Sequence, residues 1–281
     1  MKQFQKALRQ IAMDHSHGSG WLTEQIFRAV RAFFSHHTES AQYEIGNLIH
    51  ELNDLASTLD SFTLVTAAIR KINAILNGQN FSAAAFLVQL DEIYDSILGK
   101  SEYRTQRLMT LGIKNKSVLI HSHSATIIAS LSLLPPKVRP KRIYQTDSWP
   151  GLEGRLQARE LADNGYSVYR IPDPGVNRIF QAVDWVILGA DSLGATHFTN
   201  KIGSLNLVLL AREFGYPVFV LAHSAKRVPA PIPTLPSLEW QPTDRKAIKS
   251  IAPVLECVPN ALVTEFILEK SIPISKNNTF A

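Results

Sequence analysis

Three polar residues, Asp191, Asn200 and Lys201, follow a short apolar run and could together hold a small polar ligand. A carboxylate accepts hydrogen bonds from ligand hydroxyls, a carboxamide donates and accepts, and an ammonium group binds anionic oxygens. The apolar run 185–188 stops at Gly189, as a strand buried on both faces does at the edge of a parallel sheet. Because ligands of open α/β sheets bind outside the carboxyl ends of the strands, this stretch predicts a binding crevice there.

The residues that follow predict a polar loop, a helix and a further strand. Ser204 is placed to cap a helix with apolar positions at helical spacing, and Gly215-Tyr216-Pro217 would end it before a strand over residues 218–222. The helix N-terminus would then face the crevice beside Asp191. A polar loop whose side chains only satisfy backbone donors explains the same residues, and this stretch alone leaves both interpretations open.

A second candidate segment, His121-Ser122-His123-Ser124, follows a predicted strand over residues 117–120. Small hydroxyl residues before a helix supply donors for a phosphate, and an ordinary helix N-cap is an equally good explanation. The two histidines alternate with serines, as in a possible metal-binding pair. Because no acidic or cysteine ligand lies close in the sequence, we predict no metal site.

Two further segments could hold an anion. Arg155, in the first turn of a predicted helix over residues 152–164, could clamp a phosphate bidentately, although an exposed helix arginine is the simpler interpretation. Gly18, Ser19 and Gly20 precede another helix and could cradle an anion, which a flexible turn explains as well. The sequence contains no G-x-S-x-G, G-x-G-x-x-G or Walker-type pattern, so hydrolase and phosphate-loop chemistry have no local support.

The elements that must position these residues fall into two halves. Residues 1–105 carry apolar stripes at helical spacing, which predict a helical N-terminal domain. Residues 106–281 alternate short apolar runs with helical stretches, so we predict an α/β fold with a Rossmann-like parallel-sheet C-terminal domain. The predicted helices include 21–34, 43–59, 62–76, 81–98 and 152–164, and the predicted strands 117–120, 143–145, 167–171, 185–188 and 218–221.

Composition limits the class of protein. The 281 residues are 45% hydrophobic, which suits a packed core, and the net charge of +5 favours anionic ligands or partners. Dense Lys/Arg runs interleaved with aromatic residues are missing, so no direct nucleic-acid motif is indicated. One cysteine cannot form an internal disulfide, the start lacks a signal-peptide pattern, and no apolar run approaches the ~20 residues of a membrane-spanning helix. We therefore expect a cytoplasmic protein.

The landmarks together resemble one family, which contains the α, β and δ subunits of translation initiation factor 2B, methylthioribose-1-phosphate isomerase and ribose-1,5-bisphosphate isomerase. They occur in the order 118–124, Glu153-Gly154-Arg155, Gly189-Ala190-Asp191 with Asn200 to Gly203, and Val258-Pro259 with Thr264-Glu265. The resemblance covers residues 105–281 well, and Gly18-Ser19-Gly20 is similar to the family's early glycine turn. It implies a helical domain on a Rossmann-like domain, a homodimer, possible protein partners and no cofactor.

The resemblance also defines two functional expectations. The family's isomerases use a cysteine in the loop after the first strand, together with the aspartate that corresponds to Asp191, and here Ser122 stands at the cysteine position. A serine hydroxyl has no accessible pKa near neutrality and cannot shuttle a proton as a thiol does. An arginine is also missing before Gly18, and Trp149 stands where the family often has one.

We therefore expect a regulatory, initiation-factor-2B-like protein that binds a phosphorylated sugar or nucleotide. The expected ligand-binding residues are Gly18, Ser19, Gly20, Ser122, Ser124, Arg155, Asn200 and Lys201. The alternative is an aldose-ketose isomerase of a phosphorylated pentose in which Asp191 is catalytic. A third possibility is a structural subunit whose crevice is filled by its own side chains.

Overall fold

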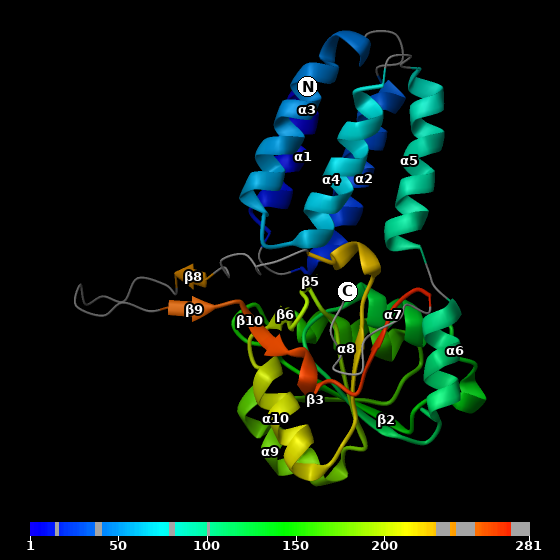
Figure 1. Ribbon diagram of the computed structural model, residues 1–281, viewed down its shortest axis with the longest axis vertical. Helices are drawn as coiled ribbons and strands as arrows, with labels where there is room; N and C mark the ends of the chain where they lie inside the picture. The colour runs from blue at the N-terminus through cyan, green and yellow to red at the C-terminus, as the bar shows by residue number, and fades with distance from the viewer. Residues whose placement is uncertain are drawn as a thin grey trace, which may run out of the picture. The chain divides into compact units, whose positions relative to one another are not determined.

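The computed structural model describes residues 1–14, 17–36, 41–78, 82–99, 102–228, 237–239 and 251–270. The chain divides into two compact units, Met1–Lys100 and Ser101–Ala281, drawn from blue to cyan and from green to red in Figure 1. The first is helical and the second is built on a parallel sheet, so the predicted fold class is confirmed. The domain boundary predicted after residue 105 falls inside a helix of the second unit, Glu102–Leu111.

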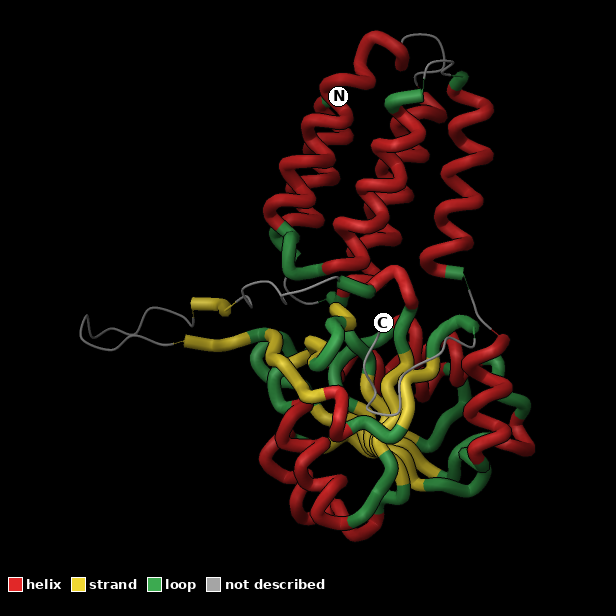
Figure 2. Tube along the Cα trace, viewed as in Figure 1, coloured by secondary structure: helices red, strands yellow, loops and turns green. Residues whose placement is uncertain are grey.

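Helices pack against one another in the first unit, where Figure 2 shows them in red. Apolar residues at helical spacing bury one face of each helix, as Phe4, Leu8 and Ile11 do in the first. The helices are α1 (Lys2–Ala12), α2 (Ser19–His36), α3 (Ala41–Thr58), α4 (Thr63–Leu76) and α5 (Ala83–Leu98), close to the predicted ranges. Every helix in the described residues is too short or too polar to cross a lipid bilayer.

The second unit contains a six-stranded parallel sheet in the order β11-β7-β4-β1-β2-β3. The strands are β1 (Ser117–Ile120), β2 (Arg142–Thr146), β3 (Val168–Ile171), β4 (Trp185–Leu188), β7 (Val218–Leu221) and β11 (Glu265–Ile267). The helices are α6 (Glu102–Leu111), α7 (Ala125–Ser132), α8 (Gly154–Asp163), α9 (Val176–Ile179) and α10 (Ser204–Phe214). β2 and β3 lie on one side of β1, whereas β4, β7 and β11 lie on its other side. The strand order therefore reverses between β1 and β4.

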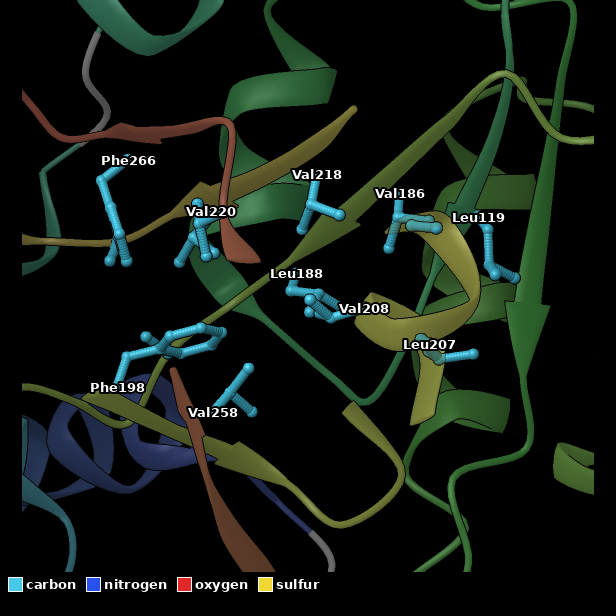
Figure 3. Packing of buried hydrophobic residues seen from close by; sticks show 14 of the residues in the cluster. Leu119, Val186, Leu188, Phe198, Leu207, Val208, Val218, Val220, Val258 and Phe266 are labelled. Carbon is cyan, nitrogen blue, oxygen red and sulfur yellow. The ribbon is translucent and has the colours of Figure 1, made fainter. Parts of the chain in front are cut away.

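A separate hydrophobic core covers each face of this sheet. Val186 and Leu188 of β4 pack into one core with Leu207 and Val208 of α10, as Figure 3 shows. The other two residues of β4, Trp185 and Ile187, pack into the second core with residues of α6, α7 and α8. Burial on both faces explains why the central strands are uninterrupted apolar runs in the sequence.

A small antiparallel sheet replaces the single polar loop that the sequence predicted between Asp191 and Ser204. It contains β5 (Ser192–Leu193), β6 (His197–Lys201) and β10 (Leu255–Pro259), in the order β10-β6-β5. The loop prediction was wrong because β6 is completed by β10, which pairs Asn200 with Glu256 from a distant part of the chain.

The remaining elements are short. A two-stranded sheet joins β8 (Ser237–Glu239) to β9 (Ile251–Pro253), and residues 229–236 and 240–250 lie outside the described residues. Single 3₁₀ turns occur at Pro136–Val138, Asp173–Gly175, Phe180–Ala182, Ser224–Lys226 and Asn260–Leu262.

Candidate functional site

The segments after β1 and β4 meet where the strand order of the parallel sheet reverses. Ile120 and Ile187 are paired in register, so both strands end side by side. A Cβ added at Gly189 would lie 3.0 Å from Ser124 Oγ and 3.8 Å from Asn200 Oδ1. Glycine therefore lets the two loops approach each other. The structure brings the Ser122 to Ser124 loop and the end of β6 together at the position where open α/β sheets bind ligands.

Glu153 is the centre of this polar cluster. Ser122 Oγ donates a 2.8 Å hydrogen bond to Glu153 Oε1, and Lys201 Nζ lies 3.0 Å from the same oxygen and 3.1 Å from Oε2. The Lys201 and Glu153 side chains are only 4% and 8% exposed, so their ion pair is buried. Two predicted ligand-binding residues thus converge on one anionic group, the carboxylate of a residue that the sequence analysis used only as a landmark.

His121 has a fixed structural position. Its Nε2 lies 2.8 Å from the carbonyl oxygen of Ile202 and must donate, which leaves Nδ1 to accept from Thr146 Oγ1 at 2.6 Å. Burial lowers the pKa of His121, although hydrogen bonding to Ile202 opposes the shift. The neutral ring therefore joins β1, β2 and the turn before α10, and neither nitrogen is left for proton transfer. His123 pairs with Glu160, with Nε2 3.1 Å from Oε1.

Ser122 adopts a left-handed backbone conformation, with φ of 67°. Its N–H donates to Ser148 Oγ at 2.8 Å, and its carbonyl accepts from Gln145 Nε2 at 3.0 Å. Ser148 has φ of 64°, and its N–H donates to Asp173 Oδ1 at 2.8 Å. Such conformations are sparsely populated by non-glycine residues and persist where surrounding contacts enforce them. These contacts aim the Ser122 hydroxyl at Glu153.

Ser124 is the N-cap of α7, as one of the two sequence interpretations had it. Its Oγ accepts from Ile127 N at 3.4 Å, and its own N–H donates to Gln157 Oε1 at 2.6 Å. Capping does not use all the hydrogen-bonding capacity of a hydroxyl, so a role of Ser124 in ligand binding stays a prediction.

The N-terminus of α10 differs from the prediction. Gly203, with φ of 101°, is the N-cap, while Ser204 Oγ donates to the Lys201 carbonyl at 2.6 Å and accepts from Asn200 Nδ2 at 2.8 Å. The N–H of Leu205 instead donates to Glu256 Oε1 of β10 at 2.8 Å. Burial raises the pKa of Glu256, and hydrogen bonds from this helix end oppose the shift. A carboxylate of the chain itself thus occupies the helix end that was expected to face the ligand.

Arg155 lies at the start of α8 and is 47% exposed. Its Nη2 is 3.1 Å from Asp147 Oδ2, and the other oxygen of Asp147 lies 2.8 Å from Arg170 Nε. A ligand phosphate would compete with Asp147 for Arg155, so the predicted phosphate contact stays a prediction.

Asp191 begins the excursion after β4, and its N–H donates to the Thr199 carbonyl at 2.8 Å. Lys226 lies nearby, with Nζ donating to the Ala190 carbonyl at 2.5 Å. Burial lowers the pKa of Lys226, and the negative charge of Asp191 raises it. Sequence reasoning missed Lys226, although it too follows a strand end, that of β7.

Gly18, Ser19 and Gly20 belong to the first unit, where α2 begins at Ser19. The Gly18 carbonyl accepts from Leu22 N at 3.2 Å, so the glycine turn leads directly into the helix. Their anion-binding role stays a prediction. Within the described residues, no group of three or more His, Cys, Asp and Glu side chains is arranged to hold a metal ion.

Comparison with known proteins gives one family match and several similar proteins. Residues 15–271 match the model of the initiation factor 2 subunit family. The chain is 34% identical to ribose 1,5-bisphosphate isomerase of Haloterrigena turkmenica over 40% of this chain and 35% of that protein. Identity to methylthioribose-1-phosphate isomerase of Geobacillus thermodenitrificans is 30%, over 60% of this chain and 52% of that protein. Identity to the translation initiation factor eIF2B subunit alpha of Caenorhabditis elegans is 27%, over 40% of this chain and 37% of that protein.

The matched stretches span about half or less of these relatives' own length. Among solved structures, the chain is similar to the Pyrococcus horikoshii OT3 translation initiation factor eIF-2B, with a TM-score of 0.80, 18% identity and 96% of each chain covered. It is also similar to a chain of the tetrameric eIF2B-beta2-delta2 complex from C. thermophilum, with a TM-score of 0.72, 16% identity and coverage of 96% and 90%. Likeness at these identities concerns the fold.

Proposed function

Because the chain belongs to the initiation factor 2 subunit family, we propose that it is an initiation-factor-2B-like regulatory protein that binds a phosphorylated sugar or nucleotide. The ligand occupies the carboxyl edge of the parallel sheet, where the strand order reverses between β1 and β4. Asp191 accepts hydrogen bonds from ligand hydroxyls, and Asn200 and Lys201 bind hydroxyl or phosphate oxygens. Ser122, Ser124 and Arg155 hold the phosphate.

The convergence of Ser122 Oγ and Lys201 Nζ on the Glu153 carboxylate carries this proposal. One hydroxyl and one ammonium already bind the two oxygens of a single anion there, within a buried cluster. A ligand phosphate that takes the place of Glu153 on Lys201 meets donors of the right type. The Ser122 hydroxyl cannot shuttle a proton as a thiol does, and both ring nitrogens of His121 are engaged in hydrogen bonds. Both observations favour ligand binding over turnover.

An isomerase is the second candidate, because the isomerase from Geobacillus thermodenitrificans is 30% identical over 60% of the chain. Asp191 then assists proton movement through an enediol intermediate of a phosphorylated pentose. This candidate expects turnover of a sugar phosphate that Asp191→Asn abolishes while the fold is kept. Turnover that is missing across a panel of sugar phosphates removes it.

The binding proposal is tested by thermal unfolding with AMP, GDP and pentose phosphates. A ligand present at 100 times its Kd is expected to add about 2.7 kcal/mol to the stability of the native state. The isosteric variant Asp191→Asn is expected to lose most of this gain, whereas Asp163→Asn, at an exposed position of α8, keeps it. Unchanged unfolding with every compound contradicts the proposal and favours a structural subunit whose polar cluster serves only its own fold.

We include dimerisation through the second unit and a cytoplasmic location in this proposal. One solved structure similar to the chain is a tetrameric complex, so relatives assemble with other subunits. Sedimentation equilibrium of the purified chain is expected to give twice the 31.3 kDa mass of one chain. A mass that stays at one chain across the micromolar range contradicts the homodimer.

A further inference from the structure

Arg104 of α6 is a buried arginine whose donors are largely unused. The residue is 3% exposed, and its one hydrogen bond among the described residues runs from Nη1 to the Ala222 carbonyl at 3.5 Å. Its Nε is buried and has no hydrogen-bond partner. A guanidinium carries five N–H donors in a fixed fork, and burying such a charge without partners is costly. The structure leaves this cation short of acceptors.

The position of Arg104 places it at the same sheet edge as the polar cluster. Ala222 is the first residue after β7, which neighbours β4. Lys226 is close enough that the positive charge of Arg104 contributes to lowering the pKa of Lys226, after the larger effect of burial. The carboxylate that acts on Arg104, Glu269, is already held by the N–H of Ser224 at 2.9 Å and by the Ser224 hydroxyl. Among the described residues, Glu269 therefore does not supply an acceptor for the Nε of Arg104.

Arg107, about one turn later on α6, shows how an arginine of this helix is satisfied internally. Its Nε and Nη2 donate to the two oxygens of Glu265 of β11, each at 2.7 Å. This bidentate pair already fastens α6 to the sheet. Attachment of the helix therefore does not account for a second, more deeply buried arginine at Arg104.

We propose that Arg104 binds a phosphate group of a ligand at the carboxyl end of β7, with Nε and an Nη nitrogen donating to two phosphate oxygens. The planar fork of arginine matches two oxygens of such an anion. The inference deepens the proposed function, because it adds a cation on the β7 side of Asp191 to the groups on the β1 side. It rests on the proposed function for the identity of the whole ligand, but not for the binding of phosphate.

Inorganic phosphate is the probe, with chloride at equal ionic strength as the reference and thermal unfolding as the measurement. Phosphate is expected to raise the Tm of the wild-type protein. Arg104→Met is expected to raise the Tm without phosphate, because it removes a buried charge that has too few hydrogen-bond acceptors, and to abolish the phosphate response. Arg107→Met, the matched change on the same helix, is expected to lower the Tm and keep the response.

Arg104→Lys keeps the charge but loses the fork, so its half-saturating phosphate concentration is expected to rise at least ten-fold. If Arg104→Met fails to fold, Arg104→Lys still tests whether phosphate binding depends on the guanidinium of Arg104. A wild-type protein that ignores phosphate, or variants of Arg104 that respond as the wild type does, overturn the inference. A response that depends on Arg104, in a protein that binds none of the sugar phosphates or nucleotides, contradicts the proposed function and keeps the inference.

Discussion

Replacing Gly154 with alanine is expected to destabilise the second unit by about 3 kcal/mol, the upper end of what overpacking a core usually costs. An added Cβ would lie 2.0 Å from the Thr146 carbonyl oxygen and 2.8 Å from Ser148 Oγ. The first of these atoms is backbone at the end of β2 and cannot rotate away. The start of α8 must shift, and the neighbouring Glu153 shifts with it, so the centre of the polar cluster is displaced as well.

Urea unfolding of the wild-type protein and the variant measures this loss. Gly46→Ala is the control, because Gly46 lies within α3 and a Cβ there meets nothing within 4 Å. Alanine at that helical position is expected to stabilise the protein by up to about 1 kcal/mol. If Gly154→Ala unfolds at the same urea concentration as the wild type, the close approach of α8 to β2 is not a constraint on the fold.

The parallel sheet was predictable because its signals are local. The run 185–188 is apolar at every position and stops at Gly189, and Gly215 ends α10 with φ of 70° just before β7. Short-range composition fixes such elements, since a strand buried on both faces needs apolar residues throughout. β6 gave no comparable signal. Its partner β10 lies more than fifty residues later, so only the folded chain reveals that Asn200 and Lys201 stand on a strand.

The candidate site was predictable in outline for a related reason. Parallel strands end at one edge, so residues after β1 and after β4 had to come close, as Ser124 and Gly189 do. The hydrogen-bond and ion-pair partners of the site residues were not predictable. Glu153 joins Ser122 to Lys201, and Glu256 occupies the helix end assigned to the ligand, because long-range packing brings these carboxylates there.

Lys201→Met is expected to cost about 3–5 kcal/mol of stability, the usual cost of removing one partner from a buried ion pair. Lys201 and Glu153 are 4% and 8% exposed, so the carboxylate left behind has little water to replace the ammonium. Ser122 Oγ would remain as a donor to Oε1, and one hydrogen bond from a neutral hydroxyl compensates only part of the loss. Urea unfolding of the variant and the wild-type protein measures the difference.

The double variant Lys201→Met with Glu153→Gln is expected to recover most of this stability, because the carboxamide removes the uncompensated charge and still accepts from Ser122. A double variant as unstable as Lys201→Met alone would mean that the unpaired charge of Glu153 is not what destabilises the single variant. The recovered protein also separates the two roles of Lys201. If Lys201 both pairs with Glu153 and binds the ligand, the double variant unfolds nearly as the wild type does. It then responds to no phosphorylated ligand. A retained response would assign Lys201 to the fold alone.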